Sequence, residues 1–371
     1  MQKIRIASFN VALDRSAPGA LAAEIGGQGS PQLRHVAAMV RRVRPDIVLL
    51  NEFDHTGDAG DSRHLSAFAE HYLAAGEHGI DYPYRYLAPV NTGLTGPLAL
   101  DGGPVPVLPQ DGLGFGAFHG QYGFAILSRF PLDTGSVRTF RRFLWQSMPG
   151  ARLPRLDGEP YYGPEVLAFL PLSSKNHVDV PVRLPGGRVL HLLASHPAPP
   201  IDEGPERRNS CRNHDELRLW HDYIRPGKGD YLVDDDGARG GLEAGADFVI
   251  LGDLNADPVD GNGFRSRTRA LLADPLLHQA VSRGRLRPAS AGARRLRTFE
   301  PRRGHPGYWT HVNGLRLDYV LPGAGLRALA SGVHWPTPEQ DEAGWFWRGQ
   351  GRPARRALGS DHRLVWVDIA L

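Results

Sequence analysis

The strongest constraint on the fold of this chain is an apolar segment that runs directly into polar residues, Phe248-Val249-Ile250-Leu251-Gly252-Asp253-Leu254-Asn255. Four apolar residues in succession are typical of a strand buried on both faces. Because side chains alternate along a strand, we expect Asp253 and Asn255 to lie on the same side, about 7 Å apart. Asp and Asn also close strands as ordinary turns, so this segment alone does not establish a functional site.

Five other segments repeat this arrangement, each a predicted strand with a polar residue at or near one end. They are Ile4–Asn10, Asp46–Glu52, Val189–His196, Leu315–Leu321 with Asp318, and Arg363–Ile369 preceded by Asp361 and His362. A single carboxylate at a strand end is most often structural, but so many polar strand ends are hard to explain as turns. We therefore expect these residues to form one site.

The same segments resemble the motifs of the endonuclease/exonuclease/phosphatase superfamily. This superfamily includes deoxyribonuclease I, abasic-site endonucleases, inositol polyphosphate 5-phosphatases and neutral sphingomyelinases. The matching motifs follow the family's order: Ser8-Phe9-Asn10, Leu50-Asn51-Glu52, Ala194-Ser195-His196-Pro197, Gly252-Asp253-Leu254-Asn255, Leu317-Asp318-Tyr319 and Gly359-Ser360-Asp361-His362. Each is weak alone, but the set is specific and spans nearly the whole chain. Asn51 replaces the usual Gln of the second motif and leaves Glu52 intact.

The resemblance implies an α+β fold, a four-layer α/β/β/α sandwich with two packed, mostly antiparallel sheets. Apolar periodicity predicts helices at Pro31–Val43 and Glu206–Ile224. The motifs run from residue 10 to residue 362, so any division of the chain would split the site, and we expect one domain over residues 1–371. Long loop insertions are expected at about 91–120, 141–176, 226–246 and 282–312.

Composition limits the classes of function. The formal net charge is only +3, so the surface as a whole is not suited to unspecific binding of nucleic acid. Cys211 is the only cysteine, which excludes an intramolecular disulfide and argues against a thiolate-ligated metal. No apolar run reaches the length of a membrane span. The acidic turn Asp234-Asp235-Asp236-Gly237 lacks the ligand spacing of a calcium loop, although Ca²⁺ stays open there.

The resemblance also implies the chemistry of phosphoester hydrolysis. That reaction needs an activated water, neutralisation of the phosphoryl charge and a proton for the leaving oxygen. Glu52 is the leading candidate for a metal ligand, assisted by Asn10 and Asp361. Oxygen ligands favour Mg²⁺ or Mn²⁺ over zinc, with Ca²⁺ as a further candidate.

Further roles carry over from the family by motif. Asp253 would orient or activate the attacking water, and Asn255 would hold a phosphoryl oxygen. His362 would contact the phosphate, with Asp318 as its partner, because a carboxylate within an apolar strand is costly without one. A second metal bound by Asp253, Asn255 and His362 stays open.

The position of His196 separates subgroups, because deoxyribonuclease I-like members have a histidine there and abasic endonucleases a tyrosine. The segments His177–Leu184 and Val189–His196 flank Pro185-Gly186-Gly187-Arg188, which predicts a hairpin. A two-residue Gly186-Gly187 turn would place His177 opposite His196, so that Asp179 orients His196 from a diagonal position. This register makes Asp179 catalytic and His196 a general acid or phosphate ligand with a raised pKa. The alternative is that His196 only ends a strand.

Four residues are expected to contact the substrate. Lys175 and His177 would lie at the mouth of the site. Arg212, in the first half of the 206–224 helix, would reach a phosphate, unless it faces solvent. Trp145, in the 141–176 insertion, would border the cleft.

The predicted function is metal-dependent hydrolysis of a small phosphodiester or phosphomonoester by in-line attack of water. A nuclease acting on DNA or RNA is the alternative, but it would favour a broad basic groove with insertable aromatics. A non-catalytic binding module on the same fold is disfavoured because every motif holds a competent residue. We expect a monomer. The first strand begins about three residues after Met1, so the protein is either cytoplasmic or has lost a leader, and similar bacterial proteins with export signals favour secretion or the periplasm.

Overall fold

The computed structural model describes residues 3–341, 344–348, 352–353 and 359–371. It contains two large β-sheets and a short two-stranded one. The strands of the first sheet are β1 (Lys3–Leu13), β2 (Ile47–Phe53), β3 (Tyr84–Leu87), β4 (Phe124–Ser128), β12 (Ala328–Val333) and β13 (Val365–Ala370). The second sheet holds β5 (Arg138–Thr139), β8 (His177–Arg183), β9 (Val189–Ser195), β10 (Asp247–Asp253) and β11 (Asp318–Pro322). The short sheet pairs β6 (Arg155–Leu156) with β7 (Glu159–Pro160).

The two large sheets have similar topology. Their strand orders are β12-β13-β1-β2-β4-β3 and β11-β10-β9-β8-β5. Among the described strands, β1–β2 and β9–β10 are the parallel pairs, and all other neighbours run antiparallel. The predicted pair of mostly antiparallel sheets is therefore confirmed.

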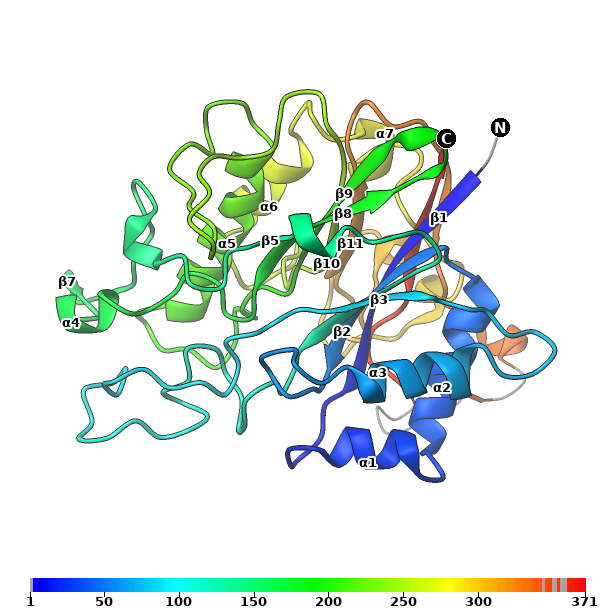
Figure 1. The fold of residues 1–371 in the computed structure, drawn as a ribbon, viewed down its shortest axis with the longest axis horizontal. Coiled ribbons are helices and arrows are strands. Elements are labelled where there is room, and N and C mark those ends of the chain that lie inside the picture. Colours follow the sequence, from blue (N-terminus) through cyan, green and yellow to red (C-terminus); the bar gives the residue numbers. More distant parts are fainter. Residues whose placement is uncertain (1–2, 342–343, 349–351, 354–358) are drawn as a thin grey trace.

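Helices cover the outer faces of the sandwich (Figure 1). The α-helices are α1 (Ala20–Gly26), α2 (Pro31–Val43), α3 (Arg63–Phe68), α4 (Pro164–Leu167), α5 (Arg208–Tyr223), α6 (Arg265–Leu272) and α7 (Gln279–Ser282). A π-helical turn spans Ala69–Leu73, and 3₁₀ turns span Thr134–Ser136, Trp145–Ser147, Pro185–Gly187, Ala293–Arg295, Pro306–Tyr308 and Pro338–Gln340. Helix α2 has the predicted bounds because Ser30 caps it: its hydroxyl accepts the Leu33 amide at 3.1 Å.

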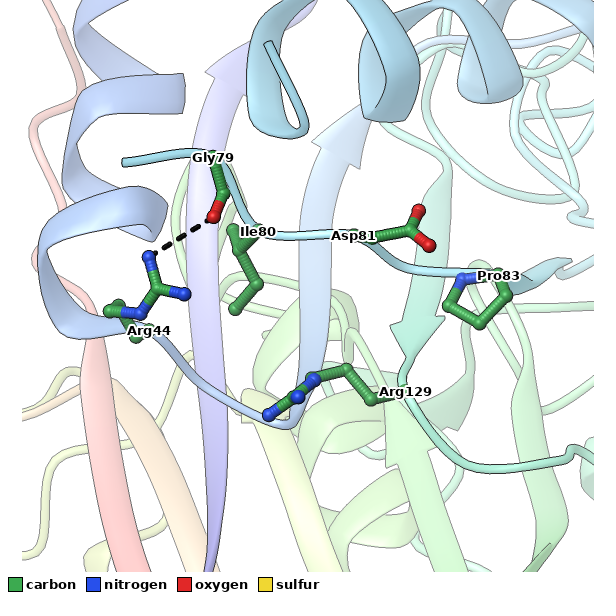
Figure 2. Close-up of a pocket in the computed structure, with 6 residues that line it drawn as sticks. All are labelled: Arg44, Gly79, Ile80, Asp81, Pro83 and Arg129. Carbon is green, nitrogen blue, oxygen red and sulfur yellow. Dashed lines mark hydrogen bonds between the residues drawn. The ribbon is translucent and has the colours of Figure 1, made fainter. Parts of the chain in front are cut away.

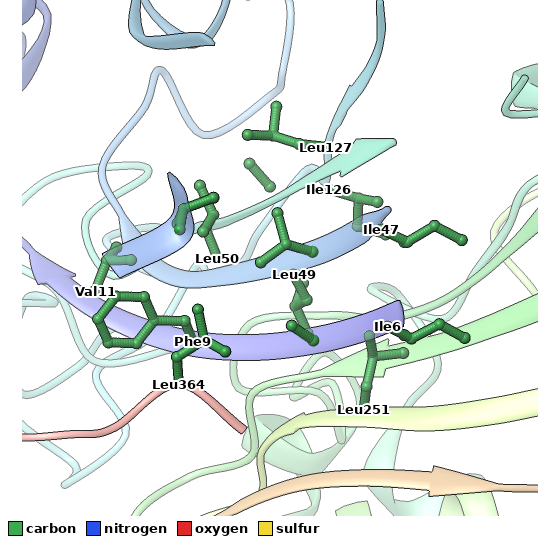
Figure 3. Close-up of a cluster of buried hydrophobic side chains, with 14 of the residues drawn as sticks. Ile6, Phe9, Val11, Ile47, Leu49, Leu50, Ile126, Leu127, Leu251 and Leu364 are labelled. Carbon is green, nitrogen blue, oxygen red and sulfur yellow. The ribbon is translucent and has the colours of Figure 1, made fainter. Parts of the chain in front are cut away.

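Apolar side chains of both sheets meet in one buried cluster (Figure 3). Ile6 of β1 and Leu251 of β10 belong to it, together with Val249. The alternate residue Ile250 packs on the opposite face of β10, in a second cluster with Trp220 of α5. Strand β10 is therefore buried on both faces, as its apolar run predicts. Asp253 continues the side of Val249 and Leu251, so its carboxylate faces the space between the sheets.

The hairpin between β8 and β9 has a different register from the predicted one. Arg183 pairs with Val189 and His177 with Ser195, which leaves Pro185–Gly187 as a three-residue loop. Both glycines of that loop have positive φ, 78° and 80°. Shifting the pairing by one residue turns every side chain to the other face, so Asp179 lies on the sheet face opposite to His196. The predicted two-residue turn was wrong.

The long insertions carry short elements and bridges. Residues 141–176 include β6, β7 and α4, and residues 226–246 include a bridge between Val233 and Arg239. The acidic turn in residues 226–246 binds an arginine side chain: Arg138 Nε donates to Asp234 Oδ2 at 2.6 Å. None of the described helices combines the length and the apolar character needed to traverse a lipid bilayer.

Candidate active site

Side chains from both sheets meet where β1, β2 and β10 end. The Asn10 amide nitrogen donates to Glu52 Oε1 and to Asp253 Oδ2, both at 2.9 Å. Asn51 adds a second bridge between the sheets, because its Oδ1 accepts the Asp253 backbone N–H at 3.1 Å. Asn10 and Asp253 are almost completely buried, whereas Glu52 is partly exposed. The structure thus brings these predicted site residues together.

The backbone of the site is strained at two of its polar residues. Glu52 and Asn255 have φ of 56° and 51°, in the left-handed region that non-glycine residues rarely adopt. Such strain costs on the order of 1–3 kcal/mol per residue and clusters at functional sites. At Asn255 the chain leaves the strand in an Asx turn, in which Asp253 Oδ1 accepts the Asn255 N–H at 3.0 Å. The predicted extended spacing of these two residues was therefore wrong.

Gly252 permits the close approach of β9 and β10. A Cβ at this position would lie 2.0 Å from the Ser195 carbonyl oxygen, well inside van der Waals contact. The absence of a side chain thus lets the residues after β9 lie against Asp253. His196 Nε2 is 3.4 Å from Asp253 Oδ2, and the Asn255 amide donates to the Pro197 carbonyl at 3.0 Å.

His362 lies between two carboxylates. Its Nδ1 is 2.9 Å from Asp318 Oδ2, and its Nε2 is 3.7 Å from Asp253 Oδ2. Thr310 fixes Asp318 by donating its hydroxyl to the same Oδ2 at 2.7 Å. The predicted partnership of His362 and Asp318 is therefore present as a buried contact.

These contacts perturb the ionisation of the site. Burial would lower the pKa of His362, but the charges of Asp318 and Asp253 outweigh it and raise that pKa well above its usual value. Burial raises the pKa of Asp318, an effect that His362 opposes. For Asp253, the neighbouring His362 and His196 outweigh burial and hold the pKa below the usual range. The site thus favours a protonated His362 beside an ionised Asp253.

The pKa of His196 is shifted in the direction opposite to the predicted one. Burial and the positive charge of Lys175 lower its pKa to about 4, although Asp253 opposes them. A raised pKa was expected from pairing with Asp179, which the hairpin register excludes. His196 is therefore neutral at pH 7.

Lys175 is buried inside the site rather than at its mouth. Its side chain is 5% exposed, and burial lowers its pKa against the attraction of Glu216, Glu52 and Asp253. Among the described residues, its ammonium group forms no hydrogen bond or ion pair. Its charge also acts on His196, the residue that follows β9.

The site offers ligand atoms for a divalent cation. Three overlapping groups each have their ligand atoms within 4.8 Å of one another: Glu52, His196 and Asp253; Asp253, Asp318 and His362; and His311, Asp361 and His362. Two buried atoms in these groups, Asp318 Oδ1 and His196 Nδ1, have no hydrogen-bond partner among the described residues. A set of carboxylate and imidazole donors with such free atoms fits a divalent metal ion.

Two predicted metal ligands are placed differently from expectation. Asn10 turns its amide nitrogen, not its oxygen, toward the carboxylates, so it links Glu52 to Asp253. Asp361 lies with His311, whose Nε2 is 3.6 Å from its carboxylate. Within the described part of the chain, Glu52 and Asp361 do not share a group of candidate ligands.

Two predicted residues of β8 face away from the site. Asp179 accepts hydrogen bonds from His191 Nδ1 at 2.8 Å and from the Tyr223 hydroxyl at 2.6 Å. His177 contacts the Ser173 hydroxyl, and burial lowers the pKa of this histidine to about 3. Both predictions were wrong because the register differs by one residue.

Arg212 and Trp145 are structural instead of substrate-facing. The Arg212 side chain is partly buried, and its guanidinium donates to four backbone carbonyls, those of Leu113, Pro171, Leu172 and Ser173. Trp145 is fully buried in the second apolar cluster, and its indole N–H donates to Asp215 at 2.8 Å. Neither side chain reaches the cluster around Asp253 in this structure.

Sequence reasoning missed Thr310, His311 and Glu216. Thr310 and His311 precede the Leu-Asp-Tyr motif by a few residues, and a turn folds them back onto it, with a bridge from His311 to His362. The signal available was a Thr-His pair directly before a turn. Glu216 gave a weaker signal, as an acidic residue on the apolar face of a predicted helix.

A cavity with a volume of about 410 Å³ lies elsewhere (Figure 2). It is lined by Arg44, Gly79, Ile80, Asp81, Pro83 and Arg129. Arg44 precedes β2, and Arg129 follows the strand end that pairs with Ile47. The cavity is therefore at the opposite end of β2 from Glu52 and is separate from the site.

Comparisons with known proteins identify the family to which this fold belongs. The family model described as Endonuclease/Exonuclease/phosphatase family matches residues 7–362. An endonuclease/exonuclease/phosphatase structure from Beutenbergia cavernae DSM 12333 superposes with a TM-score of 0.53 and 18% identity, covering 100% of this chain and 72% of that one. A family protein from Leptotrichia buccalis C-1013-b gives 0.50 and 12%, covering 99% and 100%. No curated protein matches. The chain belongs to the endonuclease/exonuclease/phosphatase family, whose members are phosphoester hydrolases.

Proposed function

We propose that the protein hydrolyses a small phosphodiester or phosphomonoester, with a divalent cation bound and water attacking phosphorus in line. The observation that carries this proposal is the buried contact of His362 with Asp318, directly beside Asp253. That contact favours a cationic imidazole next to an ionised carboxylate in a water-poor site. This pairing is suited to binding a phosphoryl oxygen and a nucleophilic water together.

The roles follow from the geometry. With Nδ1 bonded to Asp318, His362 directs Nε2–H into the site, where it would donate to a phosphoryl oxygen. Asp253, held ionised, would accept a proton from the attacking water. His196 is neutral at pH 7, so we assign it a hydrogen bond to the substrate, not the delivery of a proton to the leaving oxygen.

Residues of the ligand groups would hold the cation. Glu52 would be its main ligand, in line with the family resemblance, whereas Asp361 belongs to a separate group of candidate ligands with His311 and His362. When bound, the cation would neutralise phosphoryl charge and lower the pKa of a coordinated water. Mg²⁺ and Mn²⁺ are the expected ions.

Two features favour a small substrate over a polynucleotide. The formal net charge of +3 supplies little of the counter-charge that binding to a nucleic-acid backbone requires. Two side chains predicted to contact the substrate do not face the site, because Arg212 donates to backbone carbonyls and Trp145 is buried in the second apolar cluster. Cleavage of nucleic acid is therefore the alternative activity that the test below includes.

The test compares substrate classes with one preparation of protein. Metal-stripped protein receives Mg²⁺, Mn²⁺ or Ca²⁺ and then a bis-aryl phosphate, a mono-aryl phosphate, plasmid DNA or a phospholipid. We expect metal-dependent release of the aryl alcohol from one of the two small esters. Plasmid nicking without turnover of either small ester would refute the proposed substrate class.

A further inference from the structure

One face of α5 carries buried polar residues that contact the loops around the site. Arg212, Asn213 and Glu216 lie on this face; Asn213 and Glu216 are almost fully buried, and Arg212 is partly buried. Arg212 and Glu216 are one helical turn apart and attract each other electrostatically. Burying two charged groups is costly unless they are hydrogen-bonded, so their partners indicate what they do.

Glu216 binds two loops that border the site. Its Oε1 accepts the Ser174 backbone N–H at 2.7 Å and the Ser174 hydroxyl at 2.8 Å. Its Oε2 accepts the Ala198 N–H at 2.7 Å. Ser174 directly precedes Lys175, and Ala198 follows His196 by two residues. One carboxylate therefore fixes the backbone next to both residues.

The segment that carries Lys175 is held from two sides. On one side, Arg212 donates to the carbonyls of Leu172 at 2.9 Å and Ser173 at 3.2 Å. On the other, Asn91 donates its side-chain amide to the Ser173 carbonyl at 2.8 Å and its backbone N–H to the Lys175 carbonyl at 3.0 Å. These contacts leave the backbone around Lys175 little freedom to move.

Lys175 itself supplies the evidence for a ligand. Its ammonium carries three N–H donors. The side chain is nine-tenths buried, and within the described chain its ammonium has no hydrogen-bonded or ion-paired partner. Lys175 directly follows Ser174, whose hydroxyl is 3.5 Å from the His196 carbonyl oxygen, and the charges of Glu216, Glu52 and Asp253 attract its ammonium. An anion bound there would accept hydrogen bonds from this ammonium.

We propose that Glu216 and Arg212 are positioning residues that hold Lys175 in the site as the anchor for a phosphoryl oxygen. The proposal rests on the proposed function and assigns the recognition of the phosphate group to a lysine that the helix places. Arg212 thus serves phosphate binding through the loop it fixes, without touching the phosphate.

Binding of inorganic phosphate tests this idea without requiring turnover. Calorimetry on the metal-loaded protein gives the phosphate affinity of the wild type, Lys175→Met, Glu216→Gln and the double variant. Loss of a charged hydrogen bond should weaken binding about 10- to 100-fold in Lys175→Met. Glu216→Gln should also weaken it, by about tenfold or more, because the Gln amide nitrogen would face a backbone N–H. In the double variant, the loss should equal that of Lys175→Met alone.

A control on the same helix separates positioning from general destabilisation. Asp222→Asn removes a carboxylate bonded to Arg218 and Tyr231, about 9 Å further along the axis, and should leave phosphate affinity unchanged. Amide hydrogen exchange at Ser174 and Ala198 should accelerate in Glu216→Gln and stay slow in Asp222→Asn. If Glu216→Gln does not fold, Ser174→Ala removes one contact of Glu216 and replaces it in the cycle.

The outcomes are distinct. The positioning role would be overturned if the fold-losses of phosphate affinity in the two single variants multiplied in the double variant. An unchanged phosphate affinity in Glu216→Gln would also overturn it. Wild-type protein that binds phosphate through Lys175 but hydrolyses no phosphoester would leave the positioning role standing and refute the proposed function.

Discussion

Replacing Asp318 with Asn tests the electrostatic core of the proposed site. Asn has nearly the same shape as Asp, and its oxygen can still accept from the Thr310 hydroxyl and from His362 Nδ1. The substitution therefore removes one negative charge from a buried contact and leaves the hydrogen bonds in place. Its main expected consequence is a lower pKa for His362.

The size of this change follows from Coulomb's law. With Nδ1 and Oδ2 2.9 Å apart, the two charge centres are about 4 Å apart, which gives about 4 kcal/mol at an effective dielectric constant of about 20. That energy corresponds to a fall of about 3 pKa units. The pKa of His362, raised to about 10 in the wild type, would then be about 7, so the ring would be mostly neutral at pH 8. The kcat/KM should fall about tenfold at pH 8 and much less at pH 6, where the proton is restored.

The free energy of unfolding should also depend on pH through His362. A histidine whose folded-state pKa exceeds its unfolded value of about 6.5 stabilises the fold fully below about pH 6.5. This stabilisation is lost as the pH rises through the folded-state pKa. The wild type should therefore lose stability on going to alkaline pH, and Asp318→Asn should remove most of that dependence.

The assay is an NMR titration of the His362 ring in metal-free protein, paired with a pH profile of kcat/KM. Asp179→Asn is the matched control, because it also neutralises a buried carboxylate bonded to a histidine, on the other face of the sheet. The control should leave the pKa of His362 unchanged. An Asp318→Asn protein whose His362 titrates as in the wild type would refute the reasoning.

Three further substitutions test separate parts of the account. Glu52→Gln should lower Mn²⁺ affinity at least tenfold, measured by calorimetry, and an unchanged affinity would exclude Glu52 as a ligand. Asp179→Asn should destabilise the fold by about 1–3 kcal/mol in urea unfolding without altering Mn²⁺ affinity; a protein of wild-type stability would argue against its contacts with His191 and Tyr223. Gly252→Ala should cost about 1–3 kcal/mol through its clash with the Ser195 carbonyl, and an unfolding midpoint equal to the wild type would contradict that contact.

The sequence allowed the fold and the centre of the site to be predicted because each depends on local patterns. The apolar run of β10 and the periodicity of α2 define their own bounds, and the motif residues Asn10, Glu52 and Asp253 lie at strand ends. Two sheets that pack face to face then bring those ends together. The convergence of Asn10, Glu52 and Asp253 follows from this topology.

The wrong predictions concern residues whose place in or out of the site depends on one residue of strand register or on the direction of a side chain. A three-residue loop in place of a two-residue one turned His177 and Asp179 away from the site. Arg212 looked like a phosphate ligand because it is an arginine near the site, but the nearest acceptors are carbonyls of a neighbouring loop. Residue type predicts what a side chain can bind, and only the packing decides which partner it meets.

The central claim is that this cluster of residues hydrolyses a phosphoester with a bound divalent cation. The most direct measurement is the release of aryl alcohol from bis-aryl and mono-aryl phosphates by metal-stripped protein as Mn²⁺ or Mg²⁺ is added. Wild-type protein should turn over one of these esters only when the cation is present, and Glu52→Gln should show almost none. Turnover that resists chelation and survives Glu52→Gln, or no turnover with any cation, would contradict the account.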